Sequence, residues 1–202
     1  MLGLPKNTEL NKRLPKKAIY AKFHMNTAKK DKINSDIARI SIVNEISPTR
    51  INIAAGKNIK GFYVLLLTLK KREFDKNSII TVSKLIPQNM LIILEYAGQA
   101  RLAVYYSKLM LTEWQKTESF SIELKGIDLD TVWENIIAQI GKIQIRSGNT
   151  LDEQIIIDEK KAKLQKKITR LEKKARTEKQ PKKKFELVQE INKLKRLKDF
   201  KK

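Results

Sequence analysis

The sequence predicts a mixed α+β protein: a largely antiparallel sheet with flanking helices, followed by a C-terminal antiparallel helical hairpin. Three observations support this prediction. The run Gly61–Leu69 is apolar and rich in β-formers, as expected of a central strand covered on both faces. Other segments of strand length lie around it and are joined by turn signals. Beyond residue 150, apolar residues recur three and four positions apart, as in a coiled coil.

The composition divides the chain into a basic helical N-terminal segment (1–36), an α+β core (37–149) and a basic helical arm (150–202). In the N-terminal segment, Pro15 stands where a helix can begin, because the first turn leaves its N–H groups unpaired anyway. Ile19 and Phe23 follow at helical spacing, with Tyr20 beside them, so we expect a short helix with one apolar face. A second short helix is predicted over Thr27–Ser35.

The first half of the core is predicted to alternate strands and turns. Ile40–Val43 is strand-like, and Ser47–Thr49 contains a Ser-Pro turn signal. Asn52–Gly56 is predicted as a short strand and turn that precede the central strand. Residues 76–86 place their apolar side chains on one helical face, and Pro87 ends that helix.

The second half of the core is predicted to contain a hairpin, a strand and a helix. Met90–Tyr96 and Leu102–Tyr106 are strand-like runs on either side of a short Gly-containing connection. Apolar and polar residues alternate over Phe120–Leu124, which is typical of a half-buried strand. Asp130 is the predicted cap of a helix that ends near Gly141.

The arm is predicted to form two helices, after one more short strand at Ile143–Ile145. Thr150 and Glu153 match a capping box, in which each side chain binds the backbone N–H of the other residue. Pro181 breaks the first helix and suits the start of a second. The apolar seam positions are Leu164, Ile168, Leu171 and Ala175 in the first helix, and Leu187, Ile191 and Leu194 in the second, where Lys198 continues the same spacing.

Two arrangements of the arm satisfy this seam. Each half of the seam is only about three heptad steps long, and a single helix of this kind is marginally stable alone. An antiparallel hairpin buries both halves within one chain, and we favour it. The alternative is pairing with a partner's helices, or with a second copy of the chain as a homo-oligomer.

The composition excludes several classes of chemistry. The 202 residues include no Cys, which removes thiolate metal sites, disulfides and thiol nucleophiles. A single histidine, His24, excludes any site that needs two imidazoles. No Gly-rich phosphate loop is present. We therefore expect no catalytic residues, no metal site and no cofactor, and the protein is more simply explained as a non-enzyme.

The net charge of +21 predicts a polyanionic partner, with nucleic acid as the first choice. Residues 151–202 carry 19 Lys and Arg against 9 Asp and Glu, whereas coiled coils usually balance the two signs. Because lysine dominates and few aromatic residues intervene, we expect salt-sensitive contact with the backbone rather than base readout. The predicted contact residues are Lys160, Lys163, Lys166, Lys167, Arg170, Lys173, Lys174, Lys182, Lys183 and Lys184 in the arm, and Lys12, Arg13, Lys16 and Lys17 near the N-terminus.

An enzymatic alternative is a divergent metal-dependent nuclease of the PD-(D/E)xK type. Such enzymes use two carboxylates to hold Mg²⁺ and a lysine to assist the attacking water. Here Lys70 ends the candidate strand, but Thr68 occupies the carboxylate position and Asn52 replaces the acid of the preceding strand. Glu45 is the remaining candidate acid.

The chain resembles a bacterial and archaeal family called domain of unknown function 4391, over essentially its whole length. The segments that carry the resemblance are Leu4–Lys16, Ile51–Gly56, Ile86–Pro87 before the strand Leu91–Tyr96, Trp133–Asn135 and the basic C-terminal hairpin. The family supplies no activity and no catalytic residues. The resemblance implies a context instead: companions of helicases and DNA methyltransferases in restriction-like, antiphage operons.

The sequence thus predicts a non-catalytic accessory subunit of a DNA-defence complex, which docks on a helicase or methyltransferase and contacts nucleic-acid backbone. A purely structural coiled-coil adaptor is the other non-enzymatic alternative. No stretch approaches the roughly 18 apolar residues of a membrane helix, and the N-terminus lacks the apolar region of a secretory signal. We therefore expect a cytoplasmic protein with no membrane contact.

Overall fold

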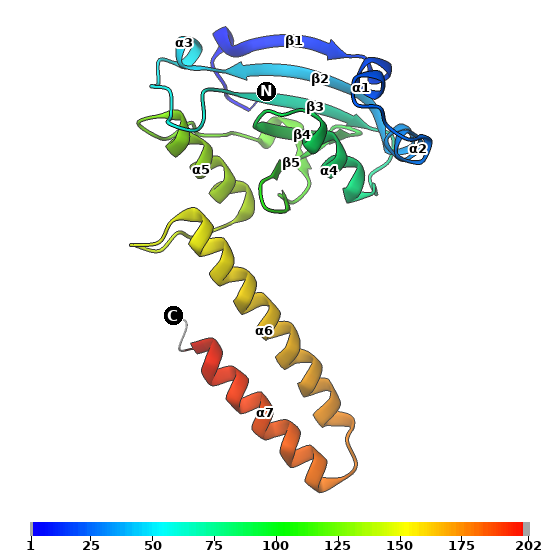
Figure 1. The fold of residues 1–202 in the computed structure, drawn as a ribbon, viewed down its shortest axis with the longest axis vertical. Coiled ribbons are helices and arrows are strands. Elements are labelled where there is room, and N and C mark those ends of the chain that lie inside the picture. The colour runs from blue at the N-terminus through cyan, green and yellow to red at the C-terminus, as the bar shows by residue number, and fades with distance from the viewer. Residues whose placement is uncertain (1, 200–202) are drawn as a thin grey trace. The chain divides into compact units, whose positions relative to one another are not determined.

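The computed structural model describes residues 2–199 of the chain, with side chains up to residue 197. The chain divides into two compact units, the core unit over residues 1–143 and the arm unit over 144–202 (Figure 1). The strands are β1 (Glu9–Leu14), β2 (Ile37–Ile46), β3 (Phe62–Leu69), β4 (Met90–Tyr96), β5 (Gln99–Tyr105), β6 (Leu109–Leu111) and β7 (Gln115–Lys116). The helices are α1 (Lys16–Lys22), α2 (Thr27–Asp36), α3 (Pro48–Ile51), α4 (Lys76–Leu85), α5 (Leu129–Gly141), α6 (Leu151–Thr177) and α7 (Pro181–Asp199), with 3-10 turns at Lys6–Thr8 and Thr117–Ser119.

The core unit is built on one mixed sheet with the strand order β1-β2-β3-β4-β5-β6, while β7 pairs with β5. All neighbouring strands are antiparallel except β3 and β4, which are parallel and are connected through α4. A parallel pair needs a long crossover connection, and α4 with its flanking loops provides it. The predicted α+β class and largely antiparallel sheet are confirmed.

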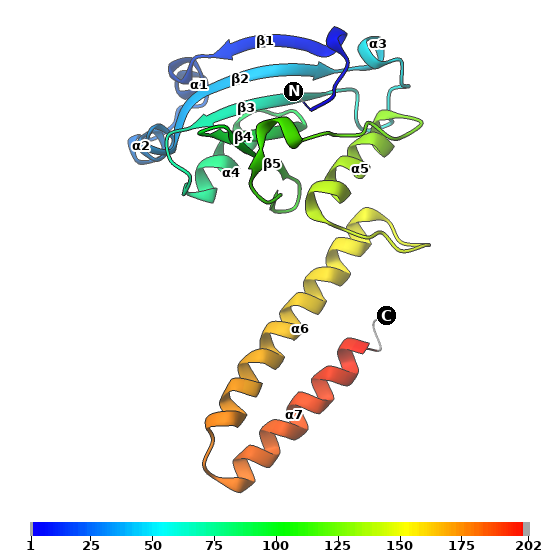
Figure 2. The same cartoon turned by 180° about the vertical axis from the view of Figure 1, so that it is seen from behind.

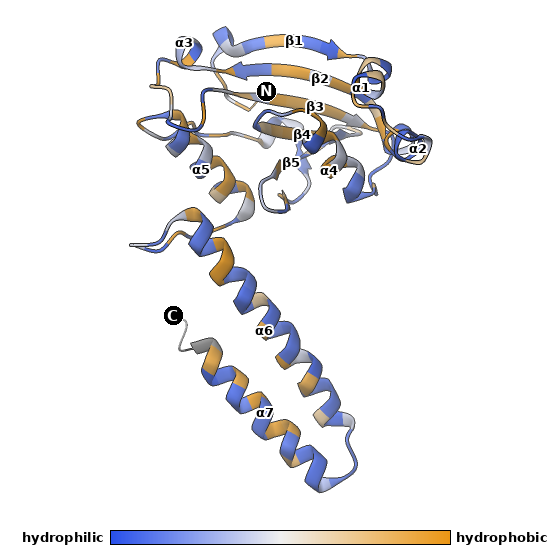
Figure 3. Ribbon diagram, viewed as in Figure 1, coloured by the Kyte–Doolittle hydropathy of each residue, from blue (hydrophilic) through white to orange (hydrophobic). Residues whose placement is uncertain are grey.

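Strand β3 is covered on both faces, as its apolar sequence predicts. Leu65 and Leu67 face a core cluster that includes side chains from α1, α2 and α4. Figures 1 and 2 show these three helices on the same side of the core unit. Phe62 points to the other face, where its ring lies 4.9 Å from the ring of Trp133 in α5. Hydropathy colouring follows this arrangement, since β2, β3 and β4 carry the apolar stretches (Figure 3).

The predicted hairpin of β4 and β5 is confirmed, and its connection has only two residues. Tyr96 pairs with Gln99, so Ala97 and Gly98 form the turn. Both residues have positive φ angles, 49° and 76°. This backbone twist matches the right-handed twist of the flanking strands, which is why two-residue hairpins favour it.

Three predicted strands are absent from the described residues, and three strands that the structure contains, β1, β6 and β7, were not predicted. Ala54 makes a single bridge with Asp128, Ser121 makes one with Leu2, and Ile143–Ile145 is irregular. Phe120 and Ile122 are nevertheless buried. The alternation of apolar and polar residues over 120–124 therefore reflects which side chains are buried, and it does not indicate a strand. Of the strands that were not predicted, β1 lies at the sheet edge and pairs with β2, while the short β6 and β7 both pair with β5.

The start of α5 corrects the predicted cap and explains a nearby glycine. Asp128, and not Asp130, is the N-cap, since its side chain accepts from the Thr131 N–H at 2.9 Å. Asp130 accepts from the backbone N–H of Ile59 at 2.6 Å and of Asn58 at 3.1 Å. These backbone hydrogen bonds lower the pKa of Asp130, against the opposing effect of desolvation. A Cβ on Gly56 would lie 2.2 Å from Asp130 Oδ1, so only glycine fits there.

The arm unit is the predicted helical hairpin (Figure 1). Thr150 and Glu153 form the expected capping box at the start of α6, and Pro181 is the first residue of α7. The two helices pack through the predicted seam, in which the side chains of five residues are buried and those of Leu164 and Leu187 are partly buried. The buried five are Ile168, Leu171, Ala175, Ile191 and Leu194. The side chain of Lys198, the last predicted seam position, lies outside the described residues.

None of the helices in the described part of the chain combines the length and the apolar character needed to cross a bilayer.

Candidate nucleic-acid interface

The candidate interface lies on α6 and follows from the position of the seam. Ile168 and Leu171 face α7. On the surface of α6 beside this seam, residues that follow one another at steps of three and four positions lie in one row. That row, which we call the basic stripe, contains Lys160, Lys163, Lys167, Arg170 and Lys174. Its members are separated by steps of three, four, three and four residues, and all five are exposed. From first to last the stripe extends about 21 Å at 1.5 Å per residue.

The stripe is only partly neutralised by α7. Lys167 Nζ lies 2.8 Å from Glu190 Oε1 across the hairpin. The hydrogen bond and charge of Lys167, with smaller contributions from Arg170 and Lys174, lower the pKa of Glu190. On the opposite flank, Lys195 pairs with Glu172 at 2.8 Å. One carboxylate thus faces several cations of the stripe, and the stripe keeps a net positive charge.

Three further predicted contact residues crowd the tip of the hairpin. Lys182, Lys183 and Lys184 occupy the first turn of α7 and are exposed, and that turn contains no acidic residue. The N-terminus of a helix carries a partial positive charge, so lysines there oppose the helix dipole. By contrast, α6 begins with Asp152 and Glu153, which agree with its dipole. Helix stability therefore does not account for the lysines at the tip.

The remaining predicted residues in the arm and core have different surroundings. Lys166 and Lys173 are exposed on α6 next to the stripe. In the core unit, the adjacent Lys12 and Arg13 are exposed on the edge strand β1, and Lys17 is exposed on α1.

Lys16 is held in the fold rather than presented to solvent. Its Nζ donates to the carbonyl oxygen of Ile37 at 2.8 Å and so ties α1 to the start of β2. Desolvation, followed by the charge of Lys70, lowers the pKa of Lys16.

The residues proposed for a nuclease site do not come together. Glu45 pairs with Tyr63 near the first end of β3, and its carboxylate lies 3.0 Å from the guanidinium of Arg50. Lys70 follows the other end of β3, seven residues away, or about 23 Å along a strand. Asn52 ends α3 in a left-handed conformation. Within the described residues, no group of three or more acidic or histidine side chains is placed to hold a metal ion.

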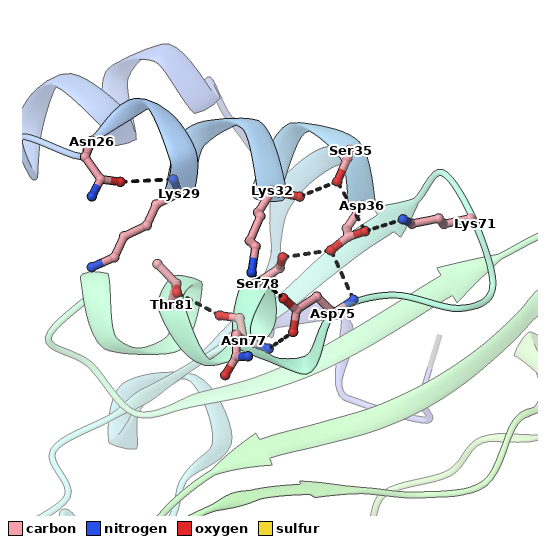
Figure 4. A network of polar contacts seen from close by, with 10 residues as sticks. All are labelled: Asn26, Lys29, Lys32, Ser35, Asp36, Lys71, Asp75, Asn77, Ser78 and Thr81. Atoms are coloured by element: carbon pink, nitrogen blue, oxygen red, sulfur yellow. Dashed lines mark hydrogen bonds and ion pairs between the residues drawn. The ribbon is translucent and has the colours of Figure 1, made fainter.

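A polar network around Asp36 was missed by the sequence analysis (Figure 4). Asp36 is 1% exposed, and it accepts hydrogen bonds from Lys71 Nζ at 2.9 Å, Ser78 Oγ at 2.7 Å and the Asp75 N–H at 3.1 Å. Asp75 in turn caps α4 and pairs with Lys32 at 3.2 Å. The network therefore joins the end of α2 to the start of α4. No sequence pattern marks a lone buried acid of this kind.

The electrostatics of Asp36 indicate a structural role, in which its charged carboxylate holds α2 and α4 together. Desolvation alone would raise the pKa of this carboxyl, but the hydrogen bonds from Lys71, Ser78 and the Asp75 N–H outweigh it and hold the pKa below its ordinary value. Both carboxylate oxygens of Asp36 are engaged by these donors.

A family model described as "Domain of unknown function (DUF4391)" matches residues 2–197. No curated protein and no solved structure matches the chain.

Proposed function

Since the chain belongs to the DUF4391 family, whose description assigns no activity, we propose a function from its own residues: a non-catalytic accessory subunit that contacts nucleic-acid backbone through the basic stripe. The setting that we propose is a DNA-defence complex in which the core unit docks on a helicase or methyltransferase. That setting rests on the operon context that the family resemblance implies.

The observation that carries the proposal is the geometry of the stripe. Five cations in one exposed row of about 21 Å match a linear polyanion, because duplex DNA carries one negative charge per about 1.7 Å of its axis. Four of the five are lysines, which bind phosphate as point charges and lack the planar fork that reads guanine edges. The stripe itself holds no aromatic or amide side chain. These features favour contact with phosphates, without base readout.

The lysines at the tip of the hairpin add a second, independent reason. They oppose the dipole of α7, so their placement lowers helix stability slightly rather than raising it. A function that needs positive charge at the tip explains why that turn lacks acids.

The test is a binding titration of the full chain with a fluorescein-labelled duplex of about 20 base pairs, which is longer than the stripe. Anisotropy should report binding at about 50 mM salt that weakens by two to three orders of magnitude at about 200 mM, as expected for some five phosphate contacts. The triple variant Lys163→Gln/Arg170→Gln/Lys174→Gln should bind more weakly at every salt concentration. Its slope of log K against log salt should be shallower by about 3.

The matched control removes the same charge from positions of the arm outside the stripe. Lys161→Gln/Arg176→Gln/Lys179→Gln also deletes three cations, but none belongs to the stripe. We expect the control variant to keep a salt slope close to that of the unaltered protein. Equal losses of duplex affinity in both variants would show that only net charge matters, and would contradict the assignment of binding to the stripe. No binding by the unaltered chain at about 50 mM salt would overturn the proposal and favour a structural adaptor.

A further inference from the structure

We propose that an apolar groove on the core unit is the docking site for an acidic segment of a protein partner, one that inserts apolar side chains and carries Asp or Glu beside them. The groove has a volume of about 390 Å³ and is lined by eleven residues, nine of them apolar. This inference gives a surface and a chemistry to the partner docking in the proposed function, and it does not depend on nucleic-acid binding.

Three parts of the core unit form the groove. Its floor is the sheet, with Ile42 of β2 and Leu65 of β3. One wall is formed by α1 and the residue after it, which contribute Ile19 and Phe23, and another wall is the segment after α4 that contains Pro87. Helix α1 has only seven residues and α4 ends at Leu85, so neither helix reaches over this part of the sheet. Ile42 on the floor is left partly exposed, whereas Leu65 beneath it is buried, at 1% exposure.

The groove remains unfilled although its walls belong to the core. Ile19, Phe23 and Ile42 pack against the buried cluster on one side and are only partly buried overall. A contiguous apolar surface of this kind on a protein marks an interaction site more often than scattered single residues do. Apolar side chains of a partner would complete the burial of these three residues, and this burial would lower the free energy of the complex.

The charges around the groove select the partner. Lys22 is the one ionisable residue besides Tyr63 among the eleven lining residues, and no acid lines the groove. Lys12 lies directly opposite Ile42 in the register of β1 and β2, so its side chain leaves the same face of the sheet. Glu45 lies opposite the lining residue Tyr63, but its carboxylate is already paired with Arg50. An apolar floor with Lys12 and Lys22 at its rim is complementary to apolar anchors flanked by carboxylates.

Other occupants fit less well. A second copy of the chain brings a further net charge of +21, which opposes self-association. Nucleic acid would meet an apolar floor with few donors. Pairing of an added strand with β1 is hindered, because the register of β1 shifts between Glu9 and Lys12 and Asn11 has a φ of 47°. Docking through side chains, as an amphipathic helix docks in a groove, is the mode that remains.

The test selects binders without knowing the partner. A phage-displayed library of random peptides is panned on the immobilised full chain, and the enriched peptides are synthesised with a fluorescent label. We expect these peptides to combine large apolar residues with Asp or Glu. Because acidic peptides also meet the basic arm, the stripe variant Lys163→Gln/Arg170→Gln/Lys174→Gln is tested alongside, and it should bind them within about twofold of the unaltered chain.

Two variants at the groove are each compared with a control that carries the same amino-acid replacement elsewhere. Lys22→Glu and Ala18→Glu alter exposed positions of α1 at the groove, and each should weaken peptide binding about tenfold or more. Lys29→Glu and Ala28→Glu make the same changes at exposed positions of α2 that do not line the groove, and they should leave binding unchanged.

Several outcomes would overturn the proposal. They are enrichment of peptides without acids, failure to enrich any peptide, equal binding by groove and control variants, and loss of binding only in the stripe variant. Self-association of the chain that Lys22→Glu changes would identify a second copy as the occupant instead. If the peptide experiment fails and duplex binding is intact, only the groove proposal is overturned. If duplex binding is absent and the acidic peptides bind at the groove, only the nucleic-acid proposal is overturned.

Discussion

Asp36 is a buried acid whose charge is fully used by its neighbours, so it links the stability of the core unit to pH. Its pKa in the folded protein lies below the ordinary value, because hydrogen bonds from Lys71, Ser78 and the Asp75 N–H outweigh desolvation. A carboxyl of this kind contributes stability above its unfolded pKa of about 4, and the contribution is lost as pH falls through the folded pKa.

The variant Asp36→Asn tests this link. At neutral pH it should lower the free energy of unfolding by about 2 kcal/mol, because the buried donors lose a charged acceptor. The difference from the unaltered protein should shrink between about pH 5 and pH 2. Tryptophan fluorescence during urea unfolding is the measurement, since both tryptophans, Trp114 and Trp133, lie in the core unit. The exposed Asp31→Asn on the same helix is the control; a difference that is independent of pH would contradict the assignment.

Gly56 provides a second residue with a defined steric role. In Gly56→Ala the new Cβ would lie 2.2 Å from Asp130 Oδ1 and 2.6 Å from the Asp130 backbone N. The loop and the start of α5 must separate, which should cost about 2 kcal/mol or more. Gly98→Ala is the comparison, because its Cβ meets no atom within 4 Å and only its φ of 76° is unfavourable, at about 1 kcal/mol. A smaller loss for Gly56→Ala than for Gly98→Ala would contradict the clash.

At the scale of elements, the seam between α6 and α7 is expected to supply most of the stability of the arm unit. Leu171 is 6% exposed within the seam, whereas Phe185 of α7 is 63% exposed. Leu171→Ala should destabilise the hairpin by about 3 kcal/mol, and Phe185→Ala should change its stability by less than about 0.5 kcal/mol. Amide hydrogen exchange along both helices measures the difference. Similar protection in the two variants would show that the seam does not hold the hairpin.

The elements that could be predicted from the sequence are those whose signals are local. Each of three features predicts its element from a few neighbouring residues: the capping box of α6, the proline of α7 and the apolar run of β3. Strand β1 could not be predicted in this way, because it is polar and largely exposed, and its ladder with β2 forms across a long separation in sequence. Asn52–Gly56 shows the converse: its apolar sequence predicts a strand, but Ala54 and Ala55 are exposed and the segment makes a single bridge, from Ala54 to Asp128.

The same distinction applies to the candidate site. The five residues of the stripe are all among the predicted contact residues, which also included Lys166 and Lys173 beside the stripe. Seam periodicity decides which of these residues share one face of α6. The ion pair of Lys167 with Glu190 and the bond from Lys16 to Ile37 could not be predicted, since each depends on how separate elements pack. The Asp36 network, which joins residues from α2, α4 and the loop between β3 and α4, is the largest such omission.

For the whole molecule, the net charge of +21 is distributed over two units with separate features. The arm unit carries the stripe and the lysines at its tip, and the core unit carries the groove and its rim. Each proposal can therefore be tested with substitutions that leave the residues of the other unit unchanged. This division also explains why an overall charge could predict a polyanionic partner but not the apolar docking surface.

The single parallel pair in the sheet has a consequence for the order in which the core unit folds. Strands β4 and β5 are separated by two residues, so their hairpin can close early with little loss of chain entropy. Strands β3 and β4 can pair only after the chain has returned through α4, and β1 must wait for the segment that contains α1 and α2. We therefore expect the β4–β5 hairpin to lead and the β1 edge to close the sheet last.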